Sequence, residues 1–276
     1  MTAVLVIAGA EIRAARRNRW VLATTLLLAA LALTLAFLGS APTGTVGAGA
    51  LEVTVVSLSS LTIFLVPLIA LLLSYDAIVG EAERGTLLLL LSYPMERWQI
   101  VLGKFLGHLA VLAFATALGY GAAGLVLGWS EAAPDAESWV AFADMIGSSI
   151  VLGAAFLALG YLVSVAVRDR GFAAGLAIGL WLALVLLYDM ALLGILVADQ
   201  GKSITAGLFN DLLLLDPADI YRLFNLSGFA KVSLFSGMAG LSGEAQFGRA
   251  ALLAALAAWV VVPLTLAALL FRRKQF

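Results

Sequence analysis

The chain has 276 residues, of which 63% are hydrophobic and only 12% charged, and its mean hydropathy is +1.08. A soluble domain is about half apolar and about a quarter charged, so a soluble fold of this size could not hide so much apolar surface. The composition therefore excludes an ordinary soluble protein and indicates a chain for which lipid is part of the solvent.

The residue types also exclude several kinds of active site. There is no cysteine, which excludes disulfides, thiolate metal sites and cysteine nucleophiles. The one histidine, His108, excludes a histidine cluster within one chain, and we interpret it as a polar packing residue. No glycine-rich P-loop with its lysine is present. The sequence therefore predicts a chain that has neither a catalytic site nor a cofactor of its own.

Six apolar stretches are long enough to cross a bilayer, which takes about 20 helical residues at a rise of about 1.5 Å each. They predict an all-α, polytopic membrane protein that forms a single transmembrane domain over residues 1–276. The predicted spans are residues 20–38, 54–75, 105–127, 145–167, 172–197 and 250–271.

The basic residues predict the orientation, because loops on the cytoplasmic side of a membrane are rich in Lys and Arg. With both termini in the cytoplasm, only Lys202, Arg222, Lys231 and Arg249 lie outside. The other basic residues all lie inside: Arg13, Arg16, Arg17, Arg19, Arg84, Arg97, Lys104, Arg168, Arg170, Arg272, Arg273 and Lys274. The reverse topology would invert this distribution, so we expect six spans with both ends inside.

The N-terminal segment, residues 2–19, mixes apolar and charged residues ahead of the first span. Val4, Ile7 and Ile12 are apolar, whereas Glu11 and Arg13 are charged. This pattern predicts an amphipathic helix that lies against the cytoplasmic face of the membrane. The alternative is a disordered basic tail that only enforces the topology.

The link between the second and third spans, residues 76–104, has the composition of a rigid docking element. Acidic residues and an arginine stand at the start of a short predicted helix, and a leucine run follows that can bury against the spans. Gly85 and Pro94 break the chain on either side of this run. An ordinary charged inside loop is the alternative reading of the same residues.

The ordered motif in this link resembles the cytoplasmic loop of ABC-2-type transporter permeases. The residues that carry the resemblance are Glu81, Glu83, Arg84, Gly85, Thr86, Leu89, Leu90, Ser92, Pro94, Arg97, Gly103 and Lys104. The resemblance implies that this link is a coupling helix seated in a groove of a separate ATPase, which binds ATP and Mg²⁺. It implies that Glu81, Glu83, Arg84, Gly85, Thr86, Leu89 and Leu90 take part in the coupling. It also implies an assembly of two permease chains with two ATPase chains.

The fifth span contains Asp189, the only acid well inside a predicted span. An acid at such depth costs a few kcal/mol unless it is paired or wetted, so Asp189 is a functional candidate. The alternative is that the helix bends or ends near Tyr188 and leaves Asp189 in water. Gly171, Gly175 and Gly179 lie on one face of this span and favour close helix packing, either within the chain or across a dimer.

The outer segment, residues 199–248, is expected to form short helices that lie on the outer surface or dip into it as a re-entrant segment. Asp216-Pro217 is typical of a helix start. Residues 214–226, with Tyr93-Pro94, resemble the permeases of the copper-processing ABC transporter in nitrous oxide reductase maturation. That finer resemblance implies a bacterial inner membrane, a cytoplasmic ATPase and a periplasmic solenoid protein. We expect Asp216, Asp219, Tyr221 and Arg222 to face the outer partner.

The methionines raise the question of a copper path, because thioethers are ligands that Cu(I) favours. Met145, Met190 and Met238 all fall toward the outer side. Methionine is also an ordinary packing residue, so these three are weak candidates for a metal path.

The function that these features favour is an ABC permease that transmits ATP-driven motion to export or to a periplasmic partner. The alternatives are a generic ABC-2 exporter permease for another substrate and a force-transmitting anchor that moves no solute. An ion-coupled secondary transporter usually has more charge inside the membrane and more internal symmetry. A membrane enzyme would need a set of nucleophile, base or metal that the sequence does not display. The substrate, whether copper, a sulfur species or another, and the direction of transport stay open.

Overall fold

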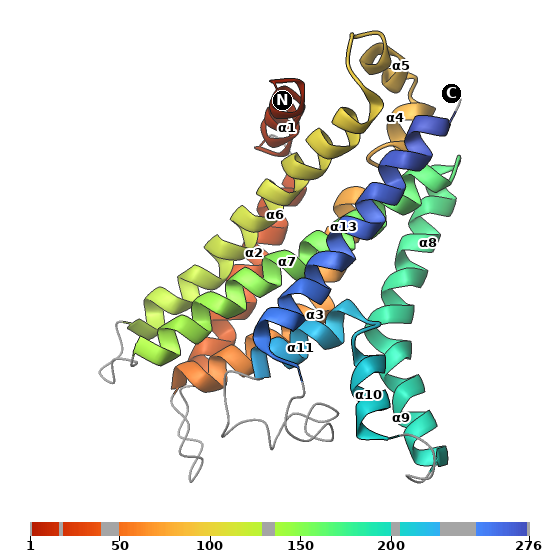
Figure 1. The fold of residues 1–276 in the computed structure, drawn as a ribbon. Coiled ribbons are helices and arrows are strands. Elements are labelled where there is room, and N and C mark those ends of the chain that lie inside the picture. Colours follow the sequence, from red (N-terminus) through yellow and green to blue (C-terminus); the bar gives the residue numbers. More distant parts are fainter. Residues whose placement is uncertain are drawn as a thin grey trace.

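The computed structural model describes residues 2–16, 19–39, 50–128, 136–199, 205–226 and 247–274. Within these ranges every regular element is a helix, and Figure 1 shows them as an elongated bundle. The elements are α1 (Thr2–Arg16), α2 (Arg19–Gly39), α3 (Ala50–Ser74), α4 (Val79–Glu83), α5 (Thr86–Leu91), α6 (Arg97–Gly128), α7 (Ala136–Ala166), α8 (Arg170–Leu182), the π-helix η1 (Ala183–Leu187), α9 (Tyr188–Asp199), α10 (Ala206–Leu213), α11 (Pro217–Leu226) and α13 (Arg249–Arg273).

Five helical segments of the described ranges are long and apolar enough to cross a membrane. They are Thr54–Glu83, Arg97–Val126, Ala136–Ala166, Arg170–Asp199 and Arg249–Arg273. The prediction of an all-helical, multi-pass membrane protein is therefore confirmed. The first predicted span coincides with α2, of which the described apolar stretch is the shorter Ala23–Thr34. The first predicted span, which would bring the number of spans to six, thus stays a prediction.

Two helices begin earlier than the apolar pattern predicts. The structure starts α6 at Arg97 and α7 at Ala136, whereas the apolar runs begin near residues 105 and 145. A helix does not have to end where its apolar residues end, because polar side chains of the additional turns can reach water or other polar groups. Hydropathy therefore locates the part of each helix that suits lipid and leaves its polar ends undetected.

The centre of the bundle is α7, which packs against α3, α6 and α13. Its small residues allow close contact with α3. A Cβ atom added at Gly160 would lie 1.9 Å from Ser74 Oγ and 3.0 Å from Ser74 Cβ. The Ser74 hydroxyl is itself held because it donates to Ala70 O at 2.8 Å. The spacing of α3 and α7 at this level therefore depends on glycine.

We expect Gly160→Ala to destabilise the protein by about 1–3 kcal/mol, since overpacking forces side chains or backbones apart. Gly147→Ala is the matched control in the same helix, because a Cβ there would meet nothing within 4 Å. It should be neutral or slightly stabilising, as alanine favours helix. Thermal unfolding of the two purified variants checks this, and equal melting temperatures would contradict the packing argument.

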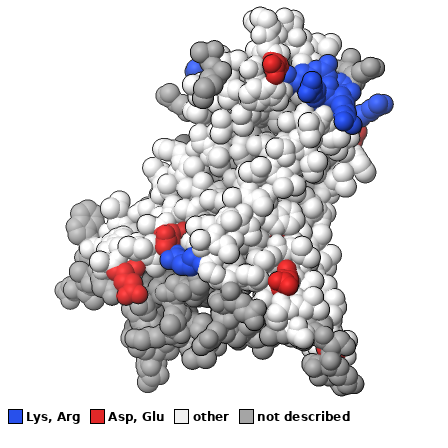
Figure 2. Space-filling model, in the orientation of Figure 1, with Lys and Arg blue, Asp and Glu red and all other residues white. Residues whose placement is uncertain are grey.

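The two ends of the bundle differ. α1, α4, α5 and the C-terminus lie at one end, and α9, α10 and α11 lie toward the other (Figure 1). On the face drawn in Figure 2, Lys and Arg gather at the first end, and a broad uncharged surface separates them from charges near the second. α8 and α9 run along one side of the bundle, and their segment is the least buried of the five candidate spans.

Candidate functional site

The α4–α5 element is a short structure that is attached to the end of the central helix, α7. The backbone N–H groups of Ile78 and Val79, at the start of α4, donate to Ser164 Oγ of α7 at 3.0 and 3.1 Å. These bonds satisfy helix-start donors that would otherwise have no partner. Gly85 joins α4 to α5 with φ 72°, a left-handed conformation that favours glycine.

The leucine run of α5 is only partly buried. Leu87 is 1% exposed, whereas Leu88 and Leu89 are 59% and 69% exposed. The run therefore buries against the bundle through Leu87, Leu90 and Leu91, and Leu88 and Leu89 stay outside it. A helix of six residues presents successive side chains around its axis, so one side can face the bundle while the other faces away. The result is an apolar tip at the end of the molecule where basic residues gather.

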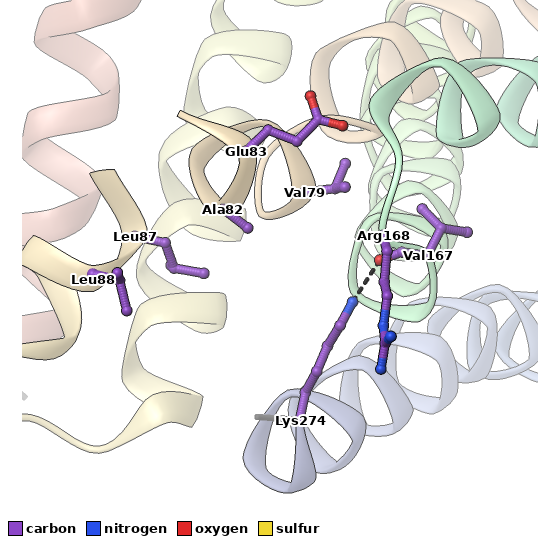
Figure 3. Close-up of a pocket in the computed structure, with 8 residues that line it drawn as sticks. All are labelled: Val79, Ala82, Glu83, Leu87, Leu88, Val167, Arg168 and Lys274. Carbon is purple, nitrogen blue, oxygen red and sulfur yellow. Dashed lines mark hydrogen bonds between the residues drawn. The ribbon is translucent and has the colours of Figure 1, made fainter. Parts of the chain in front are cut away.

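A groove lies beside this tip (Figure 3). Its volume is about 280 Å³, and its lining residues come from α4, α5, the link between α7 and α8, and the end of α13. They are Val79, Ala82, Glu83, Leu87, Leu88, Val167, Arg168 and Lys274. Lys274 Nζ donates to Val165 O at 2.8 Å and also to Val167 O, the bond that Figure 3 marks. The end of α13 is thereby fixed to the end of α7.

The two acids of the motif are bonded within the chain. Glu81 Oε1 accepts from Lys104 Nζ at 2.7 Å, and Lys104 is 4% exposed. Glu83 Oε1 accepts from the backbone N–H of Arg170 at the start of α8, at 2.7 Å. Glu81 and Glu83 therefore hold α4 against α6 and α8, and neither is a free surface charge. Thr86 extends this local network, because its hydroxyl donates to Glu81 O at 3.3 Å.

A chain of polar contacts attaches α1 to the same region. Lys104 also pairs with Glu11 of α1, and Glu11 lies 3.6 Å from His108 Nε2. His108 Nδ1 in turn is 2.8 Å from the hydroxyl of Tyr161 in α7. Burial would raise the pKa of Glu11, but its contacts with His108 and Lys104 prevail and lower it to about 2. Glu11 is thus held as a carboxylate.

Close packing accompanies these contacts between α1 and α6. A Cβ atom at Gly103 would lie 2.8 Å from Ile7 Cβ, and one at Gly107 would lie 3.0 Å from Ala8 O. The predicted N-terminal helix is confirmed, with Ile7 and Ala8 buried. Sequence reasoning included Lys104 in the motif but missed its pairing with Glu11. The spacing of Gly103 and Gly107 is a signal that could have suggested a docked helix.

At the other end, Asp189 is paired. The helix continues through η1 and α9 instead of ending near Tyr188. Arg222 of α11 donates to both Asp189 carboxylate oxygens, at 3.3 and 2.8 Å, and to Asp219 at 2.5 Å. The Arg222 and Asp189 side chains are 21% and 26% exposed. An ion pair between α9 and α11 therefore compensates the acid that the sequence singled out.

The residues expected to face an outer partner are mostly buried. Asp216, Asp219 and Tyr221 are 1%, 2% and 0% exposed. Asp216 caps α11, accepting from the Asp219 backbone N–H at 3.3 Å, as the Asp-Pro pattern predicts. The Tyr221 hydroxyl lies 3.0 Å from Ser149 Oγ of α7. In this chain these side chains join α11 to its neighbours and do not form an exposed docking surface.

The methionine candidates are not brought together within the described residues. Met145 of α7 is fully buried, whereas Met190 of α9 is 67% exposed. Met238 lies outside the described residues. No group of three or more His, Asp or Glu side chains that could hold a metal ion is found in the described ranges.

Comparison with known proteins gives the family. The family model described as ABC-2 family transporter protein matches residues 5–276. The chain belongs to the ABC-2 transporter family. Two relatives carry the name "Probable ABC transporter permease protein NosY". The relative from Pseudomonas aeruginosa PAO1 is 48% identical over 277 residues, and the one from Stutzerimonas stutzeri is 46% identical over 275. Each alignment covers 99% of both chains.

The match spans both candidate regions of this ABC-2 permease. It includes α4 and α5 with their groove at one end and the ion pair between α9 and α11 at the other. The chain is therefore a NosY-like permease, the non-catalytic transmembrane subunit of an ABC transporter.

Proposed function

We propose that the α4–α5 element receives the motion of a separate ATPase and passes it to the spanning helices. The observation that carries this proposal is the combination of an exposed apolar tip, Leu88 and Leu89, with a base anchored on α7 through Ser164. A force applied to the tip is transmitted through hydrogen bonds and packing to the central helix. ATP and Mg²⁺ are bound by the partner, a NosF-like ATPase.

The proposed topology has six spans, with α2 as the first and both termini in the cytoplasm of a bacterium. The gathering of Lys and Arg at the α4–α5 end supports it, because positive charge favours the cytoplasmic side (Figure 2). α1 is then an interfacial helix of the inner membrane. α10 and α11 are outer, re-entrant helices, since both lie toward the opposite end and α11 packs against α3, α7 and α13.

The proposed assembly contains a second permease chain. A Cβ atom added at Gly175 or Gly179 of α8 would meet no described residue within 4 Å, so these glycines serve no close packing against the described helices. A second copy on this face uses small residues that permit close helix contact. The resemblance of residues 214–226 to the permeases of the copper-processing transporter, together with the similarity to two NosY permeases, supports a role in copper-site maturation of nitrous oxide reductase, with a NosD-like periplasmic protein as partner. ATP-dependent solute flux in liposomes would separate transport from pure force transmission.

The test of coupling is Leu88→Asp with Leu89→Asp. Two charges on the apolar tip should abolish its burial against the ATPase and lower the co-purified ATPase about tenfold or more, since each lost leucine contact contributes about 1.5–3 kcal/mol. Leu88→Met with Leu89→Met is the matched control and should retain the ATPase, because methionine keeps the surface apolar. Full retention of the ATPase by the aspartate variant would contradict the proposal.

Substitution of the acids gives a less direct test. Glu81→Lys with Glu83→Lys is expected to uncouple or detach the ATPase, but Glu81 pairs with Lys104 and Glu83 accepts a hydrogen bond from the backbone at the start of α8. The change would place a second cation beside a buried lysine and disturb α4 itself. The leucine variants avoid this because their side chains are exposed.

A further inference from the structure

A second cavity at the α4 end is polar and lies apart from the groove of Figure 3. Its volume is about 300 Å³, and α1, the end of α3, α4, α6 and the start of α8 contribute to its lining. Three acids and three bases line it: Glu11, Asp76, Glu81, Arg84, Lys104 and Arg170. The formal charges of these six residues cancel. The coupling function proposed above does not involve the space inside this cavity.

Most of these charges are already paired. Lys104 bonds both Glu11 and Glu81, and Arg170 Nη2 lies 3.0 Å from Asp76 Oδ2. Two groups are left over. Within the described part of the chain, Glu81 Oε2 is buried and accepts no hydrogen bond, and Arg84 forms no ion pair. The cavity therefore has one unused acceptor and one unused cation.

Arg84 directly follows α4, which contains Glu81, but its guanidinium does not form an ion pair with the Glu81 carboxylate. Its guanidinium lies back over Gly80, where an added Cβ atom would be 3.3 Å from Arg84 Nη1 and 3.3 Å from Asp76 Oδ2. A buried carboxylate oxygen without a donor is unfavourable, and an ammonium group would satisfy it. A guanidinium matches the paired oxygens of a phosphate. A ligand that has both an ammonium and a phosphodiester can therefore pair with Glu81 through the first and with Arg84 through the second.

The position of the cavity favours a membrane lipid as the source of these two groups. The cavity lies where α3 ends at Ser74 and where the candidate span Arg170–Asp199 begins, at the polar end of that span. Leu72 and Leu73 of α3 also line it, and both are partly exposed. These side chains can contact the glycerol and the first acyl carbons while the charged residues face the headgroup.

We propose that this cavity binds the phosphoethanolamine headgroup of a zwitterionic phospholipid, with the ammonium at Glu81 and the phosphodiester at Arg84. A choline headgroup has no N–H to donate, and a glycerol headgroup has no positive charge, so both leave Glu81 Oε2 without a cationic donor. The bound lipid lies between α1 and α4 and stabilises their contact. This site goes beyond the coupling function and does not depend on it.

The test uses the full chain, purified in detergent and stripped of lipid. Phosphatidylethanolamine should raise its melting temperature by roughly 5 °C, as expected for a ligand well above its Kd, and native mass spectrometry should find it retained. Phosphatidylcholine and phosphatidylglycerol with the same acyl chains should have much smaller effects. Equal stabilisation by phosphatidylcholine would overturn the requirement for an N–H donor, and stronger binding of phosphatidylglycerol would overturn the zwitterionic assignment.

The variant for this test is Arg84→Gln, which removes the phosphate partner from an exposed position. Its affinity for phosphatidylethanolamine should fall about tenfold, the effect of losing one charge-assisted hydrogen bond. Arg13→Gln removes an exposed arginine of α1 and should bind as the unsubstituted chain does. Equal affinities of the two variants would overturn the site. Soluble phosphoethanolamine that binds as tightly as the lipid would overturn the membrane source.

Discussion

Replacement of Lys104 by methionine is expected to release α1 from the bundle. Lys104 is 4% exposed and is the cation for both Glu11 and Glu81. Removal of one partner from a buried ionic cluster costs about 3–5 kcal/mol, because the remaining charges are left without compensation. Two carboxylates would then face each other across α1 and α4, and their repulsion should open the contact of α1 with α6.

Cysteine labelling measures this release directly, because the chain has no cysteine of its own. A single Ala8→Cys reporter lies in the α1–α6 contact, where Ala8 is 8% exposed. With Lys104→Met, a water-soluble maleimide should label it at least about tenfold faster, since even 1.4 kcal/mol of opening free energy is a factor of about ten.

The matched control for Lys104 is Arg13→Met, which removes an exposed basic residue from α1 itself. Its labelling rate should equal that of the reporter chain alone. Unchanged labelling in the Lys104→Met chain would show that packing at Gly103 and Gly107 holds α1 without the ion pairs, and would contradict the prediction.

The second large effect is expected at Arg222→Met. Arg222 bonds Asp189 of α9 and Asp219 of α11, and the Asp216 cap lies beside it at the start of α11. Without the guanidinium, the carboxylates lose their only cation among the described contacts. We expect a loss of about 3–5 kcal/mol in unfolding free energy, as for other broken buried ion pairs. Thermal unfolding in detergent measures it.

Two other substitutions calibrate this result. Asp189→Asn should lower the unfolding free energy less than Arg222→Met does, because Arg222 keeps its ion pair with Asp219. The Asp189→Asn variant is expected to fold but to be impaired in function. Arg249→Met breaks an ion pair with Asp144 whose side chains are 45% and 36% exposed. Such exposed pairs contribute about 1 kcal/mol or less. Equal destabilisation by Arg222→Met and Arg249→Met would contradict a buried, compensating role for Arg222.

The candidate site could be located from the sequence but not described. The order of Glu81, Gly85 and Thr86 in the link pointed to this element, and a break in the chain was expected at Gly85, where the structure has a left-handed conformation. The exposure of Leu88 and the internal pairing of Glu81 could not be predicted. Both depend on which side of a two-turn element faces the bundle, and a run of identical leucines contains no information on that direction.

The error at the outer end has a similar cause. α11 alternates apolar and charged residues, a pattern that is also typical of a helix on a surface. Its charged side turns toward α9, where Asp189 supplies the partner for Arg222. A short amphipathic helix has the same pattern whether its polar side meets water or another polar helix. The sequence alone therefore favours a helix that faces water, which is the commoner of the two.

The sequence by itself determined the class of this protein. Several apolar runs of this length are not stable in water, and within a bilayer they are stable as helices, because a helix satisfies its own backbone polar groups. Only the tertiary structure decided the pairings of Glu11 with Lys104 and of Asp189 with Arg222, which are 93 and 33 residues apart. The physical reason is that an apolar helix face can pack equally well against lipid or against another helix, so the sequence does not show which of the two it contacts. The rotation and register of each span are therefore set by packing against its neighbours, and the ionic contacts follow from that packing.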